Sequence, residues 1–213
     1  MADMKQKIAK NLYSGDIETV AELVQDALDA GMAPGEVLSG ALIAGMDEVG
    51  RDFKAGVLFV PEVMFAARAM KAGMDVLRPL LAESEMASSG KCLVGTVKGD
   101  LHDIGKNLVT MMLDGGGFEA IDLGIDLAPS TFVDAVREHK PDLIGMSALL
   151  TTTMVQMKAT IDALEEAGLR DSVKIMIGGA PVTAAFAEQI GADAYAADAA
   201  TAVEMARELC LPQ

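Results

Sequence analysis

The sequence predicts a chain of two parts, a bundle of about four helices followed by an α/β domain with a doubly wound, five-stranded parallel sheet. Apolar residues recur at helical spacing through the first 83 residues. In the second half, five short apolar runs alternate with helical stretches, which is typical of a parallel sheet with helices on both faces. We therefore expect a helical domain over 1–88 and an α/β domain over 89–213.

Three apolar stripes define the main helices of the first part. Their members are Ile17, Val20, Val24 and Leu28; then Leu38, Leu42, Met46, Val49 and Phe53; then Val63, Ala67, Met70, Met74, Leu77 and Leu81. Gly31 and Gly56 mark helix boundaries, and Pro61 is tolerated in the first turn of the third helix. A short leading helix completes the bundle. The small, polar segment 83–90 predicts a linker.

The five strands and five helices of the second part follow from the same alternation. We expect strands at 92–97, 118–122, 142–147, 173–177 and 193–196, and helices at about 106–115, 129–139, 153–167, 181–190 and 199–209. This pattern favours the strand order 2-1-3-4-5. The loops after strands one, three and four then share one rim, and that rim is where open α/β sheets bind ligands.

Composition argues against several classes of partner. The formal net charge is −15 and both halves are acidic, so nucleic acid is not an expected partner. No apolar run approaches the roughly 20 residues that span a membrane. The first residues show no signal-peptide pattern, and Cys92 and Cys210 show neither zinc-ligand spacing nor a disulfide framework. We therefore expect a cytoplasmic protein.

The loop after the first predicted strand carries the strongest chemical signal. Asp100 lies two residues before His102, close enough to orient the imidazole through the nitrogen that does not bind a metal. Gly105 lets the backbone approach a bulky group. A histidine with its own carboxylate and no second ligand nearby predicts a metal that arrives with most of its ligands attached. The alternative is a structural loop histidine.

The next two loops of the rim carry hydroxyls and glycines. Ser147, Thr151 and Thr153 follow the third strand, and Gly178 and Gly179 follow the fourth. Together they predict a narrow, hydrogen-bonding slot beside His102. Two simpler interpretations remain open: one threonine caps the helix that begins near residue 153, and the glycines form a tight turn.

These three elements resemble the cobalamin-binding domain that methionine synthase shares with the methyltransferase corrinoid proteins. The matching patterns are Asp100-x-His102-x-x-Gly105, Ser147-x-Leu149 and Gly178-Gly179, in that order. The first half resembles the helical cap domain of the same proteins at 49–53, 59–63 and 66–71. The resemblance covers nearly the whole chain.

The resemblance implies a role for each matching residue. His102 would be the lower axial ligand of cobalt and would replace the cofactor's own dimethylbenzimidazole. Asp100 would hydrogen-bond the other ring nitrogen, and the relay would end on the hydroxyl of Thr153, where methionine synthase has serine. The relay would couple the binding and release of the ligand to proton uptake.

The remaining residues would hold the rest of the cofactor. Ser147 and Thr151 would contact the displaced nucleotide tail, and Gly105, Gly178 and Gly179 would let it enter the sheet. Phe53 and Val60 would cover the methyl-bearing face of the cobalt. Asp103, Ile104 and Leu149 complete the expected cofactor-binding set. The expected cofactor is cobalamin, present as methylcobalamin in the loaded state.

The function implied is that of a methyl carrier, a non-catalytic corrinoid subunit of a methyltransferase system. Its partners would be a substrate-specific methyltransferase, a second methyltransferase that depends on tetrahydrofolate or a thiol, and a reductive activase. The main alternative is the cobalamin module of a methionine-synthase-like enzyme. A mutase small subunit, a cobalamin-sensing regulator and a signalling domain without cofactor account for fewer of the features. The sequence does not name the methyl donor among methanol, methylamines, betaines and methoxylated aromatics.

Overall fold

The computed structural model describes residues 2–83 and 89–210, and the chain divides into two compact units. The first unit contains the N-terminal helices, and the short segment Asp114–Gly117 is grouped with it. The second unit contains the sheet and its helices. Residues 84–88, which make up most of the predicted linker, lie outside the described residues.

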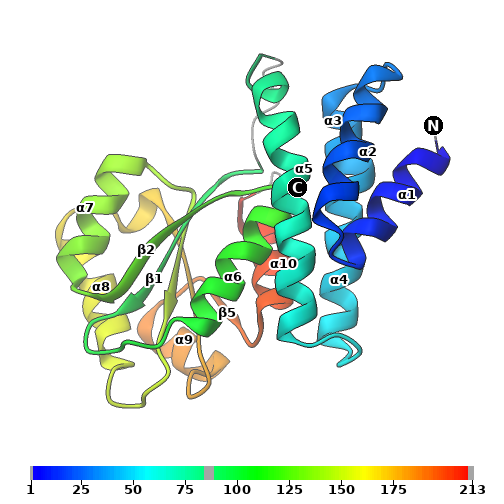
Figure 1. The fold of residues 1–213 in the computed structure, drawn as a ribbon. Helices are drawn as coiled ribbons and strands as arrows, with labels where there is room; N and C mark the ends of the chain where they lie inside the picture. The colour runs from blue at the N-terminus through cyan, green and yellow to red at the C-terminus, as the bar shows by residue number, and fades with distance from the viewer. Residues whose placement is uncertain (1, 84–88, 211–213) are drawn as a thin grey trace. The chain divides into compact units, whose positions relative to one another are not determined.

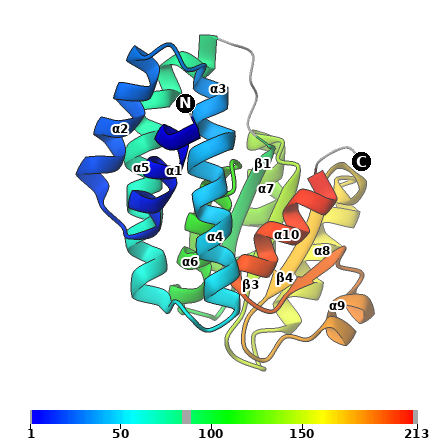
Figure 2. The ribbon, with the colours of Figure 1, turned by 90° about the vertical axis from the view of Figure 1, so that its right-hand side faces the viewer.

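The first unit is a helical bundle, as predicted (Figure 2). Its elements are α1 (Ala2–Tyr13), α2 (Ile17–Asp29), α3 (Pro34–Val37), the π-helical segment η1 (Leu38–Ile43), α4 (Ala44–Lys54) and α5 (Val60–Glu83). Because α3, η1 and α4 follow one another without a break, they form the single long helix that the second apolar stripe predicts. Asp16 caps α2 by accepting a hydrogen bond from Thr19 N.

The predicted stripes form the core of this bundle. Val20 and Val24 of α2, Leu42 of η1, and Val63 and Leu77 of α5 are all fully buried. A glycine on α5 allows a close approach between two helices. A Cβ built at Gly73 would lie 2.9 Å from Leu42 Cδ2, so the absence of a side chain there lets Leu42 pack against α5.

The second unit is a doubly wound α/β domain with the predicted strand order, β2-β1-β3-β4-β5, and every pairing is parallel. The strands are β1 (Lys91–Val97), β2 (Glu119–Leu127), β3 (Leu143–Ser147), β4 (Lys174–Gly178) and β5 (Ala194–Ala196). The helices are α6 (Ile104–Gly115), α7 (Pro129–His139), α8 (Val155–Glu166), the 3-10 turn η2 (Arg170–Ser172), α9 (Ala184–Ile190) and α10 (Ala199–Cys210).

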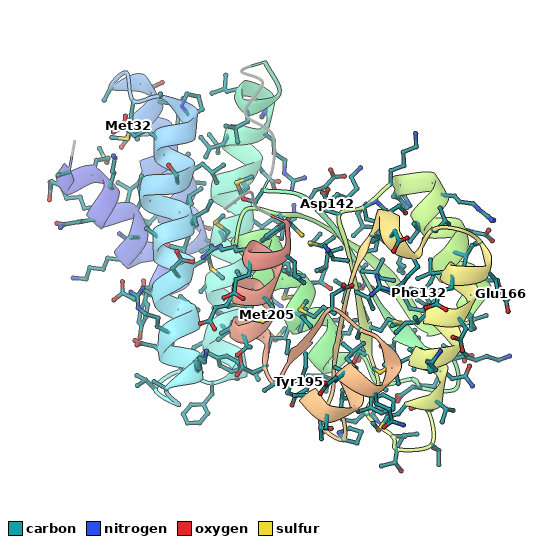
Figure 3. The ribbon with its side chains drawn as sticks, turned by 180° about the vertical axis from the view of Figure 1, so that it is seen from behind. Met32, Phe132, Asp142, Glu166, Tyr195 and Met205 are labelled. Carbon is teal, nitrogen blue, oxygen red and sulfur yellow. The ribbon has the colours of Figure 1, made fainter. Side chains whose placement is uncertain are left out.

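Helices α7, α8 and α9 cover one face of this sheet, and α6 and α10 cover the other (Figure 1). The largest fully buried side chain is that of Phe132 on α7, which packs against the sheet (Figure 3). It fits because β1 has a glycine at that point. A Cβ at Gly95 would lie 3.1 Å from the Phe132 ring and 2.5 Å from Leu127.

One strand and one helix differ from the prediction in a way that bears on the site. Strand β2 continues to Leu127 rather than ending at residue 122, and its register against β1 shifts twice on the way. Helix α8 begins at Val155, because residues 151–154 form a turn of their own. Of the residues that the structure describes, no helix is long and apolar enough to cross a membrane.

Candidate functional site

The loop between β1 and α6 leaves the carboxyl end of a central strand and places Asp100 and His102 side by side. Strand β1 is buried from Cys92 to Val97, because it lies between β2 and β3 and is covered on both faces. The Asp100 side chain is completely buried, whereas that of His102 is 51% exposed. The loop therefore exposes an imidazole at the surface, and a buried carboxylate lies behind it.

Both oxygens of the Asp100 carboxylate are saturated by hydrogen bonds. Oδ1 accepts from the His102 backbone N at 3.1 Å and from His102 Nδ1 at 2.7 Å. Oδ2 accepts from Leu149 N at 2.8 Å, Leu150 N at 3.2 Å and the Thr153 hydroxyl at 2.7 Å. Asp100 thus joins the loop after β1 to the loop after β3, and the hydrogen bonds that the resemblance implies to His102 and Thr153 are both present.

These contacts keep Asp100 ionised. Burial opposes the charged form, but the hydrogen bonds from His102, Thr153 and the Leu149 backbone outweigh burial and hold the pKa of Asp100 well below its usual range. An ionised carboxylate only accepts hydrogen bonds, so His102 Nδ1 must carry a proton. In the neutral imidazole the lone pair then lies on Nε2, and Nε2 is the atom available to a metal.

Two further polar residues that the sequence analysis did not single out support this loop. The buried Thr96 hydroxyl donates to the His102 carbonyl oxygen at 2.9 Å. The Lys106 side chain is only 2% exposed, and its Nζ lies 2.5 Å from Asp122 Oδ2 and 2.6 Å from Asn107 Oδ1. A buried ammonium without such partners would be costly, so this ion pair fixes the first turn of α6 against β2.

The hydroxyls after β3 fall into different positions. Thr153 is buried and bonds to Asp100, so it does not cap α8, whose N-cap residue Met154 makes no side-chain capping bond. Ser147 ends β3 beside Thr96 of β1, and Thr151 is exposed in the turn before α8. The structure therefore brings Thr153 to Asp100, while Ser147 and Thr151 remain on the rim.

The glycines have two distinct environments. A Cβ at Gly179, where φ is +125°, would lie 1.9 Å from the Ala148 carbonyl oxygen, and one at Gly178 would lie 2.9 Å from the Ala196 carbonyl oxygen. Packing of the protein's own backbone therefore already requires glycine at both positions. A Cβ at Gly105 would meet nothing within 4 Å, so this side of α6 has open space.

Four large apolar side chains in and beside the loops after β1 and β3 are exposed. Leu101 is 68% and Ile104 is 74% exposed, and Leu149 and Leu150 are also exposed large hydrophobics. We call these four residues the apolar rim. Asp103 is exposed and accepts a hydrogen bond from Asn107. Exposed apolar groups gathered at one place mark binding surfaces.

The chain offers a metal a single imidazole at this loop. Among residues 2–83 and 89–210, no group of three or more His, Cys, Asp and Glu side chains could hold a metal ion. A metal at His102 must therefore bring its other ligands with it. Together with the open space at Gly105 and the apolar rim, this fits a flat, largely apolar macrocycle that carries its own metal.

The two expected cap residues lie in the first unit. Phe53 is near the end of α4 and Val60 begins α5, and both side chains are half-buried. The neighbouring Asp52 accepts a hydrogen bond from the Tyr13 hydroxyl at 2.6 Å, which ties α4 to α1. The same contact raises the pKa of Tyr13.

Comparison with known proteins gives the class of this fold and site. Residues 90–205 and residues 4–78 each match a family model described as a B12 binding domain. The chain is 46% identical over 208 residues to "Trimethylamine corrinoid protein 2" of Methanosarcina mazei, with 95% of each chain covered. It is 45% identical over 208 residues to "Dimethylamine corrinoid protein" of Methanosarcina barkeri, with 97% of each covered.

A solved structure agrees. The methanol:cobalamin methyltransferase complex from Methanosarcina barkeri contains a chain that matches with a TM-score of 0.86 and 33% identity, over 99% of this chain and 81% of that one. The protein described here belongs to the family of methyltransferase corrinoid proteins, and its cofactor is cobalamin.

Proposed function

We propose that this chain is a methyl carrier that holds cobalamin with the cofactor's own base displaced and His102 as the lower ligand. The observation that carries this proposal is the hydrogen bond between Asp100 Oδ1 and His102 Nδ1 at 2.7 Å, which leaves Nε2 as the basic atom of an exposed ring. When bound, cobalamin supplies a cobalt centre that accepts a methyl group and gives it up again.

Each of the loop residues has a task that follows from its contacts. His102 would hold the cobalt through Nε2. Asp100 fixes the orientation and the tautomer of the ring, because its carboxylate accepts the hydrogen bond from Nδ1 and leaves the lone pair on Nε2. Thr153 holds Asp100 in place through its hydroxyl. The apolar rim would contact the corrin ring, and Gly105 leaves room for the displaced nucleotide tail.

The remaining assignments extend the same proposal. Ser147, Thr151, Gly178 and Gly179 lie at the ends of β3 and β4, where they would border the tail. Phe53 and Val60 would cover the methyl-bearing face and exclude water from it. This cover has to move aside during transfer, because a partner enzyme needs the same face.

We propose two partner enzymes, one that methylates the cofactor and one that removes the methyl group, with a reductase that restores the active state. Support comes from the solved methanol:cobalamin methyltransferase complex. We propose a methylated amine as the donor class, because relatives named for trimethylamine and dimethylamine share 46% and 45% of residues with this chain over nearly its whole length.

The ligand assignment is tested on the full chain reconstituted with cobalamin. We expect one cofactor per chain. In the Co(II) form, paramagnetic resonance should show nitrogen coupling that changes when histidine is labelled with nitrogen-15, and this coupling should vanish in His102→Ala. His139→Ala is the matched control, because His139 lies in the last turn of α7 and is the only other histidine. Benzimidazole coupling in the wild type would refute the assignment.

The carrier role is tested by methyl transfer with labelled donors. The reduced, reconstituted protein is incubated with trimethylamine, dimethylamine or methanol and the methyltransferase specific for that donor. We expect the label on the protein with an amine and its enzyme, followed by release to a thiol or folate acceptor when a second methyltransferase is added. Labelling only with methanol would refute the amine class, and labelling that no second enzyme can remove would refute the carrier role.

A further inference from the structure

Asp126, near the end of β2, has a backbone conformation that needs an explanation. Among the residues that the structure describes, Asp126 and Lys140 are the two non-glycine residues with positive φ, at 54° and 47°. Lys140 is the C-cap of α7, a place where left-handed residues are common. Asp126 caps no helix. Aspartate tolerates this region better than most residues, but the conformation still costs free energy, so the surrounding structure must impose it.

The conformation of Asp126 is imposed by an irregularity in strand β2. The register pairs Val94 with Asp122, Gly95 with Gly124, and Val97 with Leu127. Strand β2 therefore has one more residue than β1 between the first and second of these pairs, and one more again between the second and third. Such bulges bend a strand and re-aim its side chains, and they are frequent next to binding sites. The second bulge contains Asp126, which lies one residue before the end of β2, at the same rim as the His102 loop.

The bulge turns Asp126 back onto the loop that carries the ligand. Asp126 Oδ1 accepts a hydrogen bond from Gly99 N at 2.6 Å, and Asp126 N donates to the Asp100 carbonyl oxygen at 3.1 Å. The first bond is short and involves a carboxylate, which is the stronger kind. Gly99 itself has φ at +80°. A single residue therefore holds two consecutive residues of the loop.

Asp100 is consequently held from two sides. From the β2 side, Asp126 fixes the backbone at Gly99 and Asp100. From the β3 side, Leu149, Leu150 and Thr153 fix the Asp100 carboxylate. Because the His102 ring takes its orientation from Asp100 Oδ1, any shift of the Asp100 backbone moves the ring.

We propose that Asp126 is a positioning residue for the cobalt ligand, acting through Gly99 and Asp100 to hold the His102 ring where Nε2 can reach the metal. This proposal rests on the proposed lower-ligand role of His102. It goes beyond that role, because it assigns a distant carboxylate on a different strand to the set that determines how completely the imidazole coordinates.

Three substitutions distinguish the contribution of the Asp126 side chain from that of its backbone conformation. Asp126→Asn keeps an acceptor oxygen and a residue type that tolerates positive φ. Asp126→Gly keeps the backbone conformation and the N–H bond to Asp100 but removes the acceptor for Gly99 N. The matched control is Lys140→Gly, which makes the same type of backbone change at the other left-handed position, away from the loop.

The first measurement uses the full chain without cofactor. Amide hydrogen exchange at Gly99 should be about tenfold faster in Asp126→Gly than in the wild type, since one hydrogen bond is lost. The nitrogen-15 shifts of the His102 ring should move in the same variant. Lys140→Gly should match the wild type in both signals, and Asp126→Asn, which keeps a neutral acceptor, should lie closer to the wild type than Asp126→Gly does. Unchanged Gly99 exchange in a folded Asp126→Gly chain would show that the Asp126 carboxylate does not hold Gly99 and would overturn the proposal.

The second measurement uses the cobalamin-loaded chain. In the Co(II) form, the fraction of protein with histidine nitrogen coupling should fall at least twofold in Asp126→Gly and recover in Asp126→Asn. A full wild-type fraction in Asp126→Gly would overturn the positioning role. If the wild type itself lacks histidine coupling, the ligand assignment fails, while the exchange and ring signals still decide whether Asp126 orients His102. If Asp126→Gly does not fold, Asp126→Ser, whose shorter side chain withdraws the acceptor from Gly99, takes its place in both measurements.

Discussion

The Thr153 hydroxyl donates to Asp100 Oδ2 at 2.7 Å, and this bond joins two loops that are 53 residues apart in the sequence. The Thr153 backbone N donates to the Leu150 carbonyl oxygen at 3.1 Å, so Thr153 also closes its own turn. Both the carboxylate and the threonine are buried, which makes the contact costly to break.

This bond predicts different outcomes for two substitutions of Thr153. Thr153→Val keeps the shape but removes the donor, so we expect the free energy of unfolding of the cofactor-free chain to fall by about 1–3 kcal/mol. Thr153→Ser keeps the donor and should cost less than half as much. Urea unfolding measures both. A larger loss in Thr153→Ser than in Thr153→Val would show that the methyl group, and not the hydroxyl, is what Thr153 contributes.

The low pKa of Asp100 predicts acid sensitivity of the cofactor-free chain. The folded state lowers this pKa, so the unfolded chain takes up the proton first as pH falls. The stabilisation is therefore fully present above the ordinary aspartate pKa of about 3.9 and is lost progressively below it. Asp100→Asn should be less stable at pH 7 and should show a flatter decline below about pH 4. Parallel stability curves would contradict the prediction.

The same substitution tests the tuning of the metal. Asp100→Asn should still bind cobalamin, but it should shift the Co(II)/Co(I) potential and change its pH dependence, because the hydrogen-bonding partner of a metal-bound imidazole tunes the metal. Redox titration at several pH values measures this. A potential–pH curve that coincides with the wild-type curve would mean that Asp100 does not act on the cobalt through His102.

Substitutions at two glycines of the rim test packing and cofactor binding separately. Gly179→Ala should destabilise the cofactor-free chain by at least ~3 kcal/mol, because its Cβ would overlap the Ala148 carbonyl oxygen. Gly105→Leu should leave the fold intact, because the position faces open space, but should weaken cobalamin binding at least tenfold. Thermal unfolding and equilibrium binding distinguish the two. Normal cobalamin affinity in Gly105→Leu would remove Gly105 from the cofactor site.

Phe53 tests the proposed cover over the methyl group. Phe53→Ala should keep the bundle folded at a cost below ~3 kcal/mol, since the side chain is only half-buried. Photolysis of the methylated protein should become faster, because a methyl radical that is no longer enclosed escapes before it recombines. Phe65→Ala, which truncates an exposed phenylalanine of α5, is the control. Identical photolysis rates in the wild type and Phe53→Ala would leave Phe53 as a packing residue.

Most of the fold could be predicted because its signals are local. The apolar stripes of the helices and the buried runs of β1, β3 and β4 each follow from short-range periodicity, and their alternation determines the parallel order. The end of β2 could not be predicted this way. It is an edge strand with two bulges, so its side chains follow no simple alternation, and the apparent end at residue 122 was wrong.

The candidate site could likewise be predicted only where its signals are local in the sequence. Asp100 and His102 are two residues apart, so their hydrogen bond could be expected from spacing. Thr153 was a candidate among the hydroxyls after the third strand, and its link to Asp100 came from the family resemblance. The structure shows that Thr153 bonds to Asp100 and does not cap α8. The contributions of Asp126 and Thr96 depend on strand register and leave no local pattern. Glycines gave an ambiguous signal, because Gly178 and Gly179 already have a packing reason.

His102 is held at its backbone N, its carbonyl oxygen and its ring Nδ1, by Asp100 and Thr96, although half of its side chain is exposed. Exposed side chains normally lose rotational freedom when they coordinate a metal. Here most of that freedom has already been lost during folding. For the ligand role proposed for His102, each binding and release at Nε2 would therefore carry only a small entropic penalty.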